Sequence, residues 1–370
     1  MGSSFQAFEL EQWQSEFEHR VEINLADSGV LPMRLRELLG EDHGLADVSL
    51  HYPEVNGNRA LRERIAALHP GADADNVLVT VGGSEANQVV ADTLLRADDH
   101  VVVLRPGYLQ VYGLAMNRGC QVDTLDLDAD MGWHLDPESA SKWITPGTRL
   151  VSVTTPNNPT GAVLTPEEVN RIVETCQATG AWLHVDEVYR GSELDGCESP
   201  SLFGATPRTI VVGSLSKAYG LPGLRIGWIV APHELIGELW RRHEYATISA
   251  ASVSMYLACL ALSDGVRQRL LERQRKLARS GLEIVSAWVA DHADLVSLVP
   301  PQATALAFVR YAASMPSVRV AELLRDQAAV LVAPGAYLGA ERHLRIAHAL
   351  DPARTQEALR RIARVLRECT

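Results

Sequence analysis

The feature that most limits the possible folds is a series of short, continuous apolar runs in the middle of the chain. The runs are rich in Val, Ile and Leu, and they alternate with segments of helical spacing such as residues 84–97. A strand needs apolar residues along its whole length when both faces of its sheet are covered by helices. We therefore predict an α/β fold with a mostly parallel sheet, whose strands include residues 76–83, 100–106, 149–155, 181–187, 209–215 and 227–231.

One of the intervening helices has a clear start signal. Thr165 is followed by Pro166 and, three positions after the threonine, by Glu168. A threonine N-cap, a proline at the first helical position and a glutamate at the third form a capping box. The helix that begins there lies between two predicted strands, as a right-handed crossover between parallel strands requires.

The last hundred residues have a different pattern, which predicts a second domain. A long, charged, amphipathic helix spans residues 266–292, and short strands and a final helix follow. The sequence therefore predicts a smaller α+β domain beside the large one. We place the large domain at residues 46–270, and the small domain at residues 1–45 together with 271–370.

Composition excludes several classes of function. The chain of 370 residues has 34 Lys+Arg against 46 Asp+Glu, a formal net charge of −12, which disfavours nucleic acids and anionic membranes as partners. No apolar run is long enough to span a bilayer, and the N-terminus lacks a signal-peptide core. The five cysteines form no C-x-x-C pair, so we expect neither a metal site nor disulfides, and a cytoplasmic location.

The residues that follow the predicted strands carry the chemistry, because ligands of such sheets bind beyond the carboxyl ends of the strands. Gly83 and Ser84 open a helix and can bind an anion, although a plain turn is the simpler explanation for them alone. Lys217 follows another strand among small residues, which favour a desolvated lysine of lowered pKa that forms a Schiff base. An exposed surface lysine is the ordinary alternative.

Three further strand ends add residues that are ambiguous alone. Asp186 closes an otherwise apolar strand and needs a partner, Tyr108 is able to stack on a flat ring, and Asn158 stands at a turn. Together these residues describe a ligand with a phosphate, a flat ring with a protonatable nitrogen, and an aldehyde, which is pyridoxal phosphate. The predicted cofactor-binding residues are Gly82, Gly83, Ser84, Tyr108, Asn158, Asp186, Tyr189, Ser214, Ser216, Lys217 and Arg225, and the family resemblance given next adds Tyr52.

The motifs TVGGSEAN, RPGY, TPNNPTG, DEVY, SLSKAYGLPGLRIGW and LRIAHA stand in this order. In this order they resemble the class I/II aminotransferases, pyridoxal-phosphate enzymes of fold type I, and look closest to capreomycidine synthase-like members. The resemblance implies a seven-stranded, mostly parallel large sheet and a homodimer in which Tyr52 reaches the partner's active site. It implies catalytic roles for Lys217, Asp186 and Tyr189, with internal and external aldimines at Lys217. It also implies that Arg345 binds the α-carboxylate of an amino acid substrate.

The sequence leaves the reaction open at the substrate side. Asp27, Ser28 and Gly29 occupy the place of the family's substrate-contacting loop, so we include them with Arg345 and Asn158 as substrate-binding candidates. Transfer of the amino group to a 2-oxo acid is the first hypothesis. The alternative is elimination and cyclisation of a hydroxylated arginine, as in capreomycidine or enduracididine synthase-like enzymes, with Asp27 holding the guanidinium. A remote third hypothesis is a pyridoxal-phosphate-binding regulatory domain, which residues 1–45 disfavour because they are few and acidic.

Overall fold

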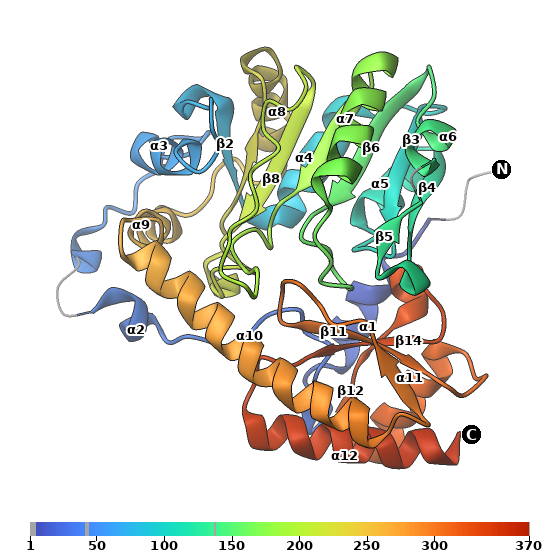
Figure 1. Cartoon of the computed structure of the whole chain (residues 1–370). Coiled ribbons are helices and arrows are strands. Elements are labelled where there is room, and N and C mark those ends of the chain that lie inside the picture. The colour runs from blue at the N-terminus through green and yellow to red at the C-terminus, as the bar shows by residue number, and fades with distance from the viewer. Residues whose placement is uncertain (1–4, 41–43, 137, 370) are drawn as a thin grey trace.

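The computed structural model describes residues 5–40, 44–136 and 138–369, and it confirms the α/β class. Figure 1 shows the large sheet with its helices in the upper part of the view and a smaller sheet with α11 and α12 below it. The large sheet has eight strands in the order β2-β9-β8-β7-β6-β3-β4-β5. Their bounds are β2 Val77–Thr80, β3 His100–Arg105, β4 Gln121–Asp128, β5 His134–Leu135, β6 Thr148–Thr154, β7 Trp182–Asp186, β8 Thr209–Ser214 and β9 Gly227–Val230.

The large sheet is mostly parallel, as predicted, and has one strand more than predicted. Strands β4, β3, β6, β7 and β8 pair in parallel, whereas β2, β9 and β5 pair antiparallel with their neighbours. Two strands were not predicted, β4 and the edge strand β5. In β4 aspartates alternate with apolar residues, because the strand is partly exposed, and β5 has only two residues. Neither strand forms the continuous apolar run on which the prediction relied.

Both faces of the large sheet are covered, which explains the continuous apolar strands. Leu78, Val101 and Ile210 pack in one buried cluster with residues of the helices on that face. Their sequence neighbours Val79 and Val102 point the other way and belong to a second cluster. The first face carries α4 (Gly82–Leu94), α5 (Gln110–Asn117) and α8 (His233–Ala246), and the second carries α6 (Ser139–Trp143) and α7 (Pro166–Thr179).

Helix α7 begins where the capping box predicts. The Thr165 side chain accepts a hydrogen bond from the Glu168 amide at 3.2 Å, and the Glu168 carboxylate accepts one from the Thr165 amide at 2.7 Å. Two amide groups that lack partners inside the helix are thereby satisfied. The helix connects β6 to its parallel neighbour β7.

The smaller sheet is built from the C-terminal part of the chain in the order β10-β11-β14-β13. Its strands are β10 Val296–Leu298, β11 Leu306–Tyr311, β13 Ala333–Pro334 and β14 His343–Ala347, and the nearby helices are α10 Val266–Asp291, α11 Ser317–Ala328 and α12 Pro352–Glu368. The remaining elements are α1 Glu9–Phe17, β1 Ile23–Asn24, α2 Leu35–Leu39, α3 Arg59–Ala66, α9 Ser252–Ala261, β12 Val330–Leu331 and the 3₁₀ helices η1 Leu45–Asp47, η2 Ala74–Asn76, η3 Ala129–Met131, η4 Pro222–Leu224 and η5 Gly335–Leu338.

The N-terminal segment lies against this C-terminal part. Ile23 of β1 pairs in parallel with Val330 of β12, and the Trp13 indole nitrogen donates to the Val332 carbonyl at 2.9 Å. This contact brings α1 and the loop after β1 to the edge of the large sheet. The domain boundaries at residues 46 and 271 stay a prediction. In the described residues, none of the helices combines the length and the apolar character that crossing a bilayer demands.

Candidate active site

A cavity of about 290 Å³ lies at the carboxyl ends of β6, β7 and β8, where the topology predicts a ligand site. Thr154, Asp186 and Ser214, the last residues of these strands, line it. Eleven of the residues predicted from the sequence line this one cavity: Ser28, Gly83, Ser84, Tyr108, Asn158, Asp186, Tyr189, Ser214, Ser216, Lys217 and Arg225. The parallel strands bring these segments together because their carboxyl ends meet at one edge of the sheet.

Lys217 lies in the loop after β8 and its side chain reaches the N-terminal segment. Its Nζ donates a hydrogen bond to Ser28 Oγ at 2.6 Å. Burial lowers the pKa of Lys217 from its ordinary value, while the nearby Asp27 carboxylate opposes that shift and Arg345 adds to it. The direction is the one expected for a lysine that must be unprotonated to attack an aldehyde.

Asp186 ends β7 and is 7% exposed. One carboxylate oxygen accepts a hydrogen bond from the Val188 amide at 3.1 Å. Burial raises the pKa of Asp186 to about 6, and hydrogen bonds from Val188 and the Asn87 side chain oppose the shift. A cationic N–H group placed beside this carboxylate lowers its pKa again, so the site favours a protonated ring nitrogen.

The opposite end of the cavity is an anion cradle around Arg225. This residue adopts φ of 51°, in the left-handed region that side chains other than glycine rarely adopt, and its Nη1 lies 3.4 Å from Ser216 Oγ. Gly82 also has a positive φ, and a Cβ there would collide with the Arg225 guanidinium. Gly83 and Ser84 stand in the first turn of α4, whose amides favour negative charge.

Two tyrosines and Asn158 complete the wall. The Tyr108 hydroxyl donates to Glu11 Oε1 at 2.8 Å, and burial followed by the Glu11 charge raises the pKa of Tyr108. Tyr189 is 3% exposed and burial raises its pKa as well. Asn158 Oδ1 accepts a hydrogen bond from Arg345 Nη1 at 3.0 Å.

Arg345 lies on β14 beside the cavity and is 1% exposed. Its Nη2 donates to the Ala26 carbonyl, and its Nε is a buried donor without a hydrogen-bond partner among the described residues. Burial lowers the pKa of Arg345, and Tyr189, Asp27 and Glu11 oppose this shift. A buried guanidinium with an unused donor is suited to bind a carboxylate.

Besides Arg345, four predicted residues do not line the cavity. Gly82 lies behind it, against Arg225, and Asp27 and Gly29 flank Ser28, with the Gly29 amide donating to Asp27 Oδ1 at 3.0 Å. Tyr52 is 81% exposed and lies outside the cavity. Its predicted contact with a partner subunit stays a prediction.

Sequence reasoning missed several lining residues. Glu11 comes from α1, far from the other lining residues in the sequence, and carries no local signal. Asn87 stands one helical turn after Gly83 in the TVGGSEAN motif, so helical spacing pointed to it. Gln110, Thr154, Val188 and Pro222 complete the set.

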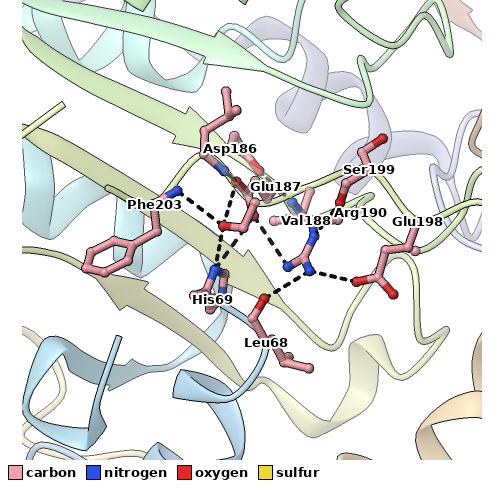
Figure 2. A network of polar contacts seen from close by, with 12 residues as sticks. Leu68, His69, Asp186, Glu187, Val188, Arg190, Glu198, Ser199 and Phe203 are labelled. Atoms are coloured by element: carbon pink, nitrogen blue, oxygen red, sulfur yellow. Dashed lines mark hydrogen bonds and ion pairs between the residues drawn. The ribbon is translucent and has the colours of Figure 1, made fainter. Parts of the chain in front are cut away.

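Glu187, next to Asp186, lies in a network of buried polar groups (Figure 2). Its Oε1 accepts hydrogen bonds from the Leu202 amide at 2.7 Å and from Ser201 Oγ at 3.0 Å. Its Oε2 lies 3.6 Å from Arg190 Nη1 and 3.8 Å from His69 Nδ1. Burial raises the pKa of Glu187 to about 7, and the Arg190 charge opposes the shift.

The hydrogen bonds and ion pairs of this network hold the turn that follows Asp186 in place. Arg190 donates to the carbonyls of Ser199 and Leu68, both at 2.9 Å, and pairs with Glu198, also at 2.9 Å (Figure 2). Burial lowers the pKa of His69 to about 3, so its ring is neutral near pH 7. The turn therefore has buried partners on both sides.

The raised pKa of Glu187 predicts a pH dependence of stability. Between its ordinary value of 4.5 and about 7, the folded protein keeps a proton that the unfolded chain has released. The free energy of unfolding therefore falls as pH rises through that window. The Glu187→Gln variant has no proton to lose at this position. Its free energy of unfolding should therefore fall less than that of the wild type as pH rises, by at most about 3 kcal/mol.

Urea unfolding at about pH 5 and pH 8 measures this difference. Glu167→Gln, at an exposed position of α7, is the control and should keep the wild-type pH dependence. If Glu187→Gln and the wild type lose stability in parallel, Glu187 is not the group that titrates.

The cavity fits pyridoxal phosphate in three respects. The anion cradle around Arg225 and the buried Asp186 carboxylate lie within one cavity. Lys217, which lies between these two residues in the sequence, lines the same cavity. The absence of a side chain at Gly82 leaves the Arg225 guanidinium room to take its place at the cavity. The donors of Arg225 and of the first turn of α4 suit a phosphate.

Comparisons with known proteins agree with this fit. The family model of aminotransferase class I and II matches residues 31–362. An arginine–pyruvate transaminase of Pseudomonas aeruginosa is 31% identical over 322 residues, 85% of this chain and 81% of its own length. A capreomycidine synthase of Streptomyces vinaceus is 29% identical over 346 residues, 91% of this chain and 88% of its own.

Solved structures agree as well. A crystal structure of a PLP-dependent aminotransferase from Streptococcus suis superposes with a TM-score of 0.92 at 29% identity, covering 100% of this chain and 99% of that one. The family match spans both sheets, the cavity-lining residues from Gly83 to Arg225, and Arg345, whereas Glu11 and Ser28 precede it. The chain therefore belongs to the aminotransferase class I and II family, pyridoxal-phosphate-dependent enzymes of fold type I.

Proposed function

We propose that this enzyme transfers the α-amino group of an amino acid with a cationic side chain to a 2-oxo acid. The observation that carries the proposal is the composition of one cavity and its border, which combine Lys217, Asp186 and the Arg225 cradle with two carboxylates that have no ion-pair partner among the described residues. Those carboxylates are Glu11, which lines the cavity, and Asp27, which flanks Ser28.

Each residue has a role that its surroundings support. Bound pyridoxal phosphate supplies an aldehyde that captures the substrate's amino group and a protonated ring that accepts electrons from Cα. Arg225, Ser214, Ser216 and the first turn of α4 bind the phosphate, and Tyr108 covers the ring. Asp186 holds the proton on the ring nitrogen. Lys217 would hold the cofactor through its aldehyde and would move the proton at the substrate's Cα.

The substrate's two charged ends have separate partners in this proposal. Arg345 binds the α-carboxylate, because its planar guanidinium offers paired donors and its Nε is unused. Asn158 and Tyr189 position the ring oxygen of the cofactor. The carboxylates of Glu11 and Asp27 both oppose the lowering of the pKa of Lys217 and of Arg345, so they lie near the place that the substrate occupies. A positively charged group on the substrate's side chain neutralises these two carboxylates.

This assignment predicts a change in substrate preference. Arginine and citrulline have the same length and shape, but only arginine carries a positive charge on its side chain. Glu11→Gln and Asp27→Asn should each lower kcat/KM for arginine by about 10- to 100-fold, the usual contribution of a hydrogen bond to a charged group, and change citrulline little.

Glu9→Gln changes an exposed glutamate of the same helix and should keep the wild-type preference. If both Glu11→Gln and Asp27→Asn keep the wild-type ratio of arginine to citrulline, the cationic donor class is wrong. Transamination itself is judged separately, because it does not depend on which donor is preferred.

Elimination and cyclisation of a hydroxylated arginine is the second candidate. The same two carboxylates favour it, since they suit a guanidinium, and one relative is a capreomycidine synthase. One experiment separates the two reactions: incubate the holoenzyme with arginine, hydroxyarginines and neutral amino acids without a 2-oxo acid. Pyridoxamine phosphate and a 2-oxo product indicate transamination, whereas loss of water from the substrate with the cofactor unchanged indicates elimination.

The proposal includes a homodimer. Leu50, Tyr52 and Tyr245 are each more than four-fifths exposed, and Ser252 Oγ donates to the His51 carbonyl, which joins the two segments that carry them. Large exposed apolar side chains of this kind favour a protein interface. Light scattering should give twice the chain mass of 40.4 kDa, and a monomer in the holoenzyme would exclude the role of Tyr52. The five free cysteines support a cytoplasmic location.

A further inference from the structure

A chain of hydrogen bonds runs from the cavity wall into the large sheet. Gln110 Nε2 donates to the Ser84 carbonyl at 2.9 Å, and Asn87 Nδ2 donates to Gln110 Oε1 at 3.0 Å. Asn87 Oδ1 lies 3.0 Å from His184 Nε2, and His184 Nδ1 lies 2.9 Å from Ser152 Oγ. Asn87, His184 and Ser152 are all buried.

The donor and the acceptor of every hydrogen bond in this series follow from the first acceptor, the Ser84 carbonyl. A carbonyl only accepts, so Gln110 must turn its nitrogen to Ser84 and its oxygen to Asn87. Asn87 must then turn its nitrogen to Gln110 and its oxygen to His184. The Nε2 of His184 therefore carries the proton, and its Nδ1 accepts from the Ser152 hydroxyl.

The fold explains why these side chains meet. Ser152 of β6 and His184 of β7 are direct partners in the parallel ladder, so their side chains point to the same face of the sheet. Asp186 follows His184 by two residues, on that same face. Helix α4 covers this face and supplies Asn87. Burial lowers the pKa of His184 to about 4, so its ring is neutral near pH 7 and has a single proton to place.

Asn87 and Asp186 line the same cavity, and the second hydrogen of the Asn87 amide is free to serve Asp186. A hydrogen bond from the Asn87 side chain is among the groups that lower the pKa of Asp186 against the effect of burial. With the amide turned over, its oxygen would face the carboxylate, and His184 Nε2 would face an NH₂ group. Both contacts would lose their hydrogen bonds, which is costly for buried polar groups.

We propose that His184 is a positioning residue for the reaction: it holds the Asn87 amide with its NH₂ group toward Asp186 and so keeps Asp186 ready to hold the proton of the cofactor's ring nitrogen. The inference rests on the proposed placement of that nitrogen beside Asp186. His184 itself touches neither cofactor nor substrate in this account, and Ser152 acts one step farther away by donating to His184 Nδ1 and so fixing the orientation of the ring.

The test is the protonation of the ring nitrogen, followed by ¹⁵N NMR of holoenzyme loaded with ring-¹⁵N pyridoxal phosphate. In His184→Leu the Asn87 oxygen has no donor, so the nitrogen should lose its proton at a pH lower by about one unit or more than in the wild type. Affinity for the cofactor should fall by about tenfold. His184→Gln retains a donor and should stay near the wild type, and Ser152→Ala should shift the midpoint in the same direction by less.

His348→Leu is the matched control, because His348 is also fully buried but takes no part in the hydrogen bonds that link Ser152, His184 and Asn87. It should leave the nitrogen signal unchanged even if it lowers stability. The inference is overturned if His184→Leu and Ser152→Ala both keep the wild-type midpoint, or if His184→Gln falls as far as His184→Leu. An unprotonated nitrogen in the wild type would instead refute the placement of Asp186, and the inference with it.

Discussion

Replacing Lys217 with alanine is expected to lower turnover by at least about 10³-fold. The variant loses the nitrogen that we propose to bond to the cofactor aldehyde and to move the proton at Cα. The phosphate cradle is untouched, so the variant should still bind pyridoxal phosphate, with the absorbance of the free aldehyde rather than that of the lysine-bound cofactor. Turnover assays and the visible spectrum measure the two effects.

The other two lysines provide matched controls. Lys142 lies over the Trp143 ring and Lys276 stands on α10, and neither lines the cavity. Lys142→Ala and Lys276→Ala should retain both the spectrum and the turnover of the wild type. Lys217→Ala with the wild-type spectrum would show that the cofactor is bound elsewhere.

Replacing Arg345 with lysine is expected to lower kcat/KM by about 10²- to 10³-fold, mainly through KM. A lysine keeps the positive charge but cannot offer two parallel donors to a carboxylate. It also leaves Asn158 Oδ1 or the Ala26 carbonyl without its present donor. The measurement is steady-state kinetics with the preferred amino acid.

A truncated substrate separates binding of the α-carboxylate from general damage to the fold. The amine that matches the substrate but lacks its α-carboxylate should react equally slowly with the wild type and with Arg345→Lys. If the variant loses the same factor with both compounds, Arg345 supports the fold and does not bind the carboxylate. The melting temperature of each variant shows how much stability has changed.

The sequence was sufficient to predict that the proposed cofactor-binding residues meet in one cavity, because most of them follow strand ends. Lys217, Asp186 and Ser84 each follow an apolar strand in a recognisable motif, and parallel pairing brings all three to one edge of the sheet. The chemistry of each residue type then limits the ligand. The same reasoning gave the correct fold class, since continuous apolar strands require helices on both faces.

The remaining parts depend on contacts that no local pattern records. Glu11 reaches Tyr108 only because α1 packs against the C-terminal part through Trp13. The chain through His184 depends on the register of β6 and β7, and a single polar residue inside an apolar strand does not specify it. Strand β4 was missed because it is partly exposed and alternates with aspartates.

Reduction of the holoenzyme with borohydride, followed by peptide mass mapping, tests the central claim most directly. Borohydride fixes pyridoxal phosphate to whichever lysine holds its aldehyde, and the chain has three lysines, Lys142, Lys217 and Lys276. The account predicts the added mass on the peptide that contains Lys217 and on no other. The added mass on Lys142 or Lys276, or on no lysine at all, would contradict it.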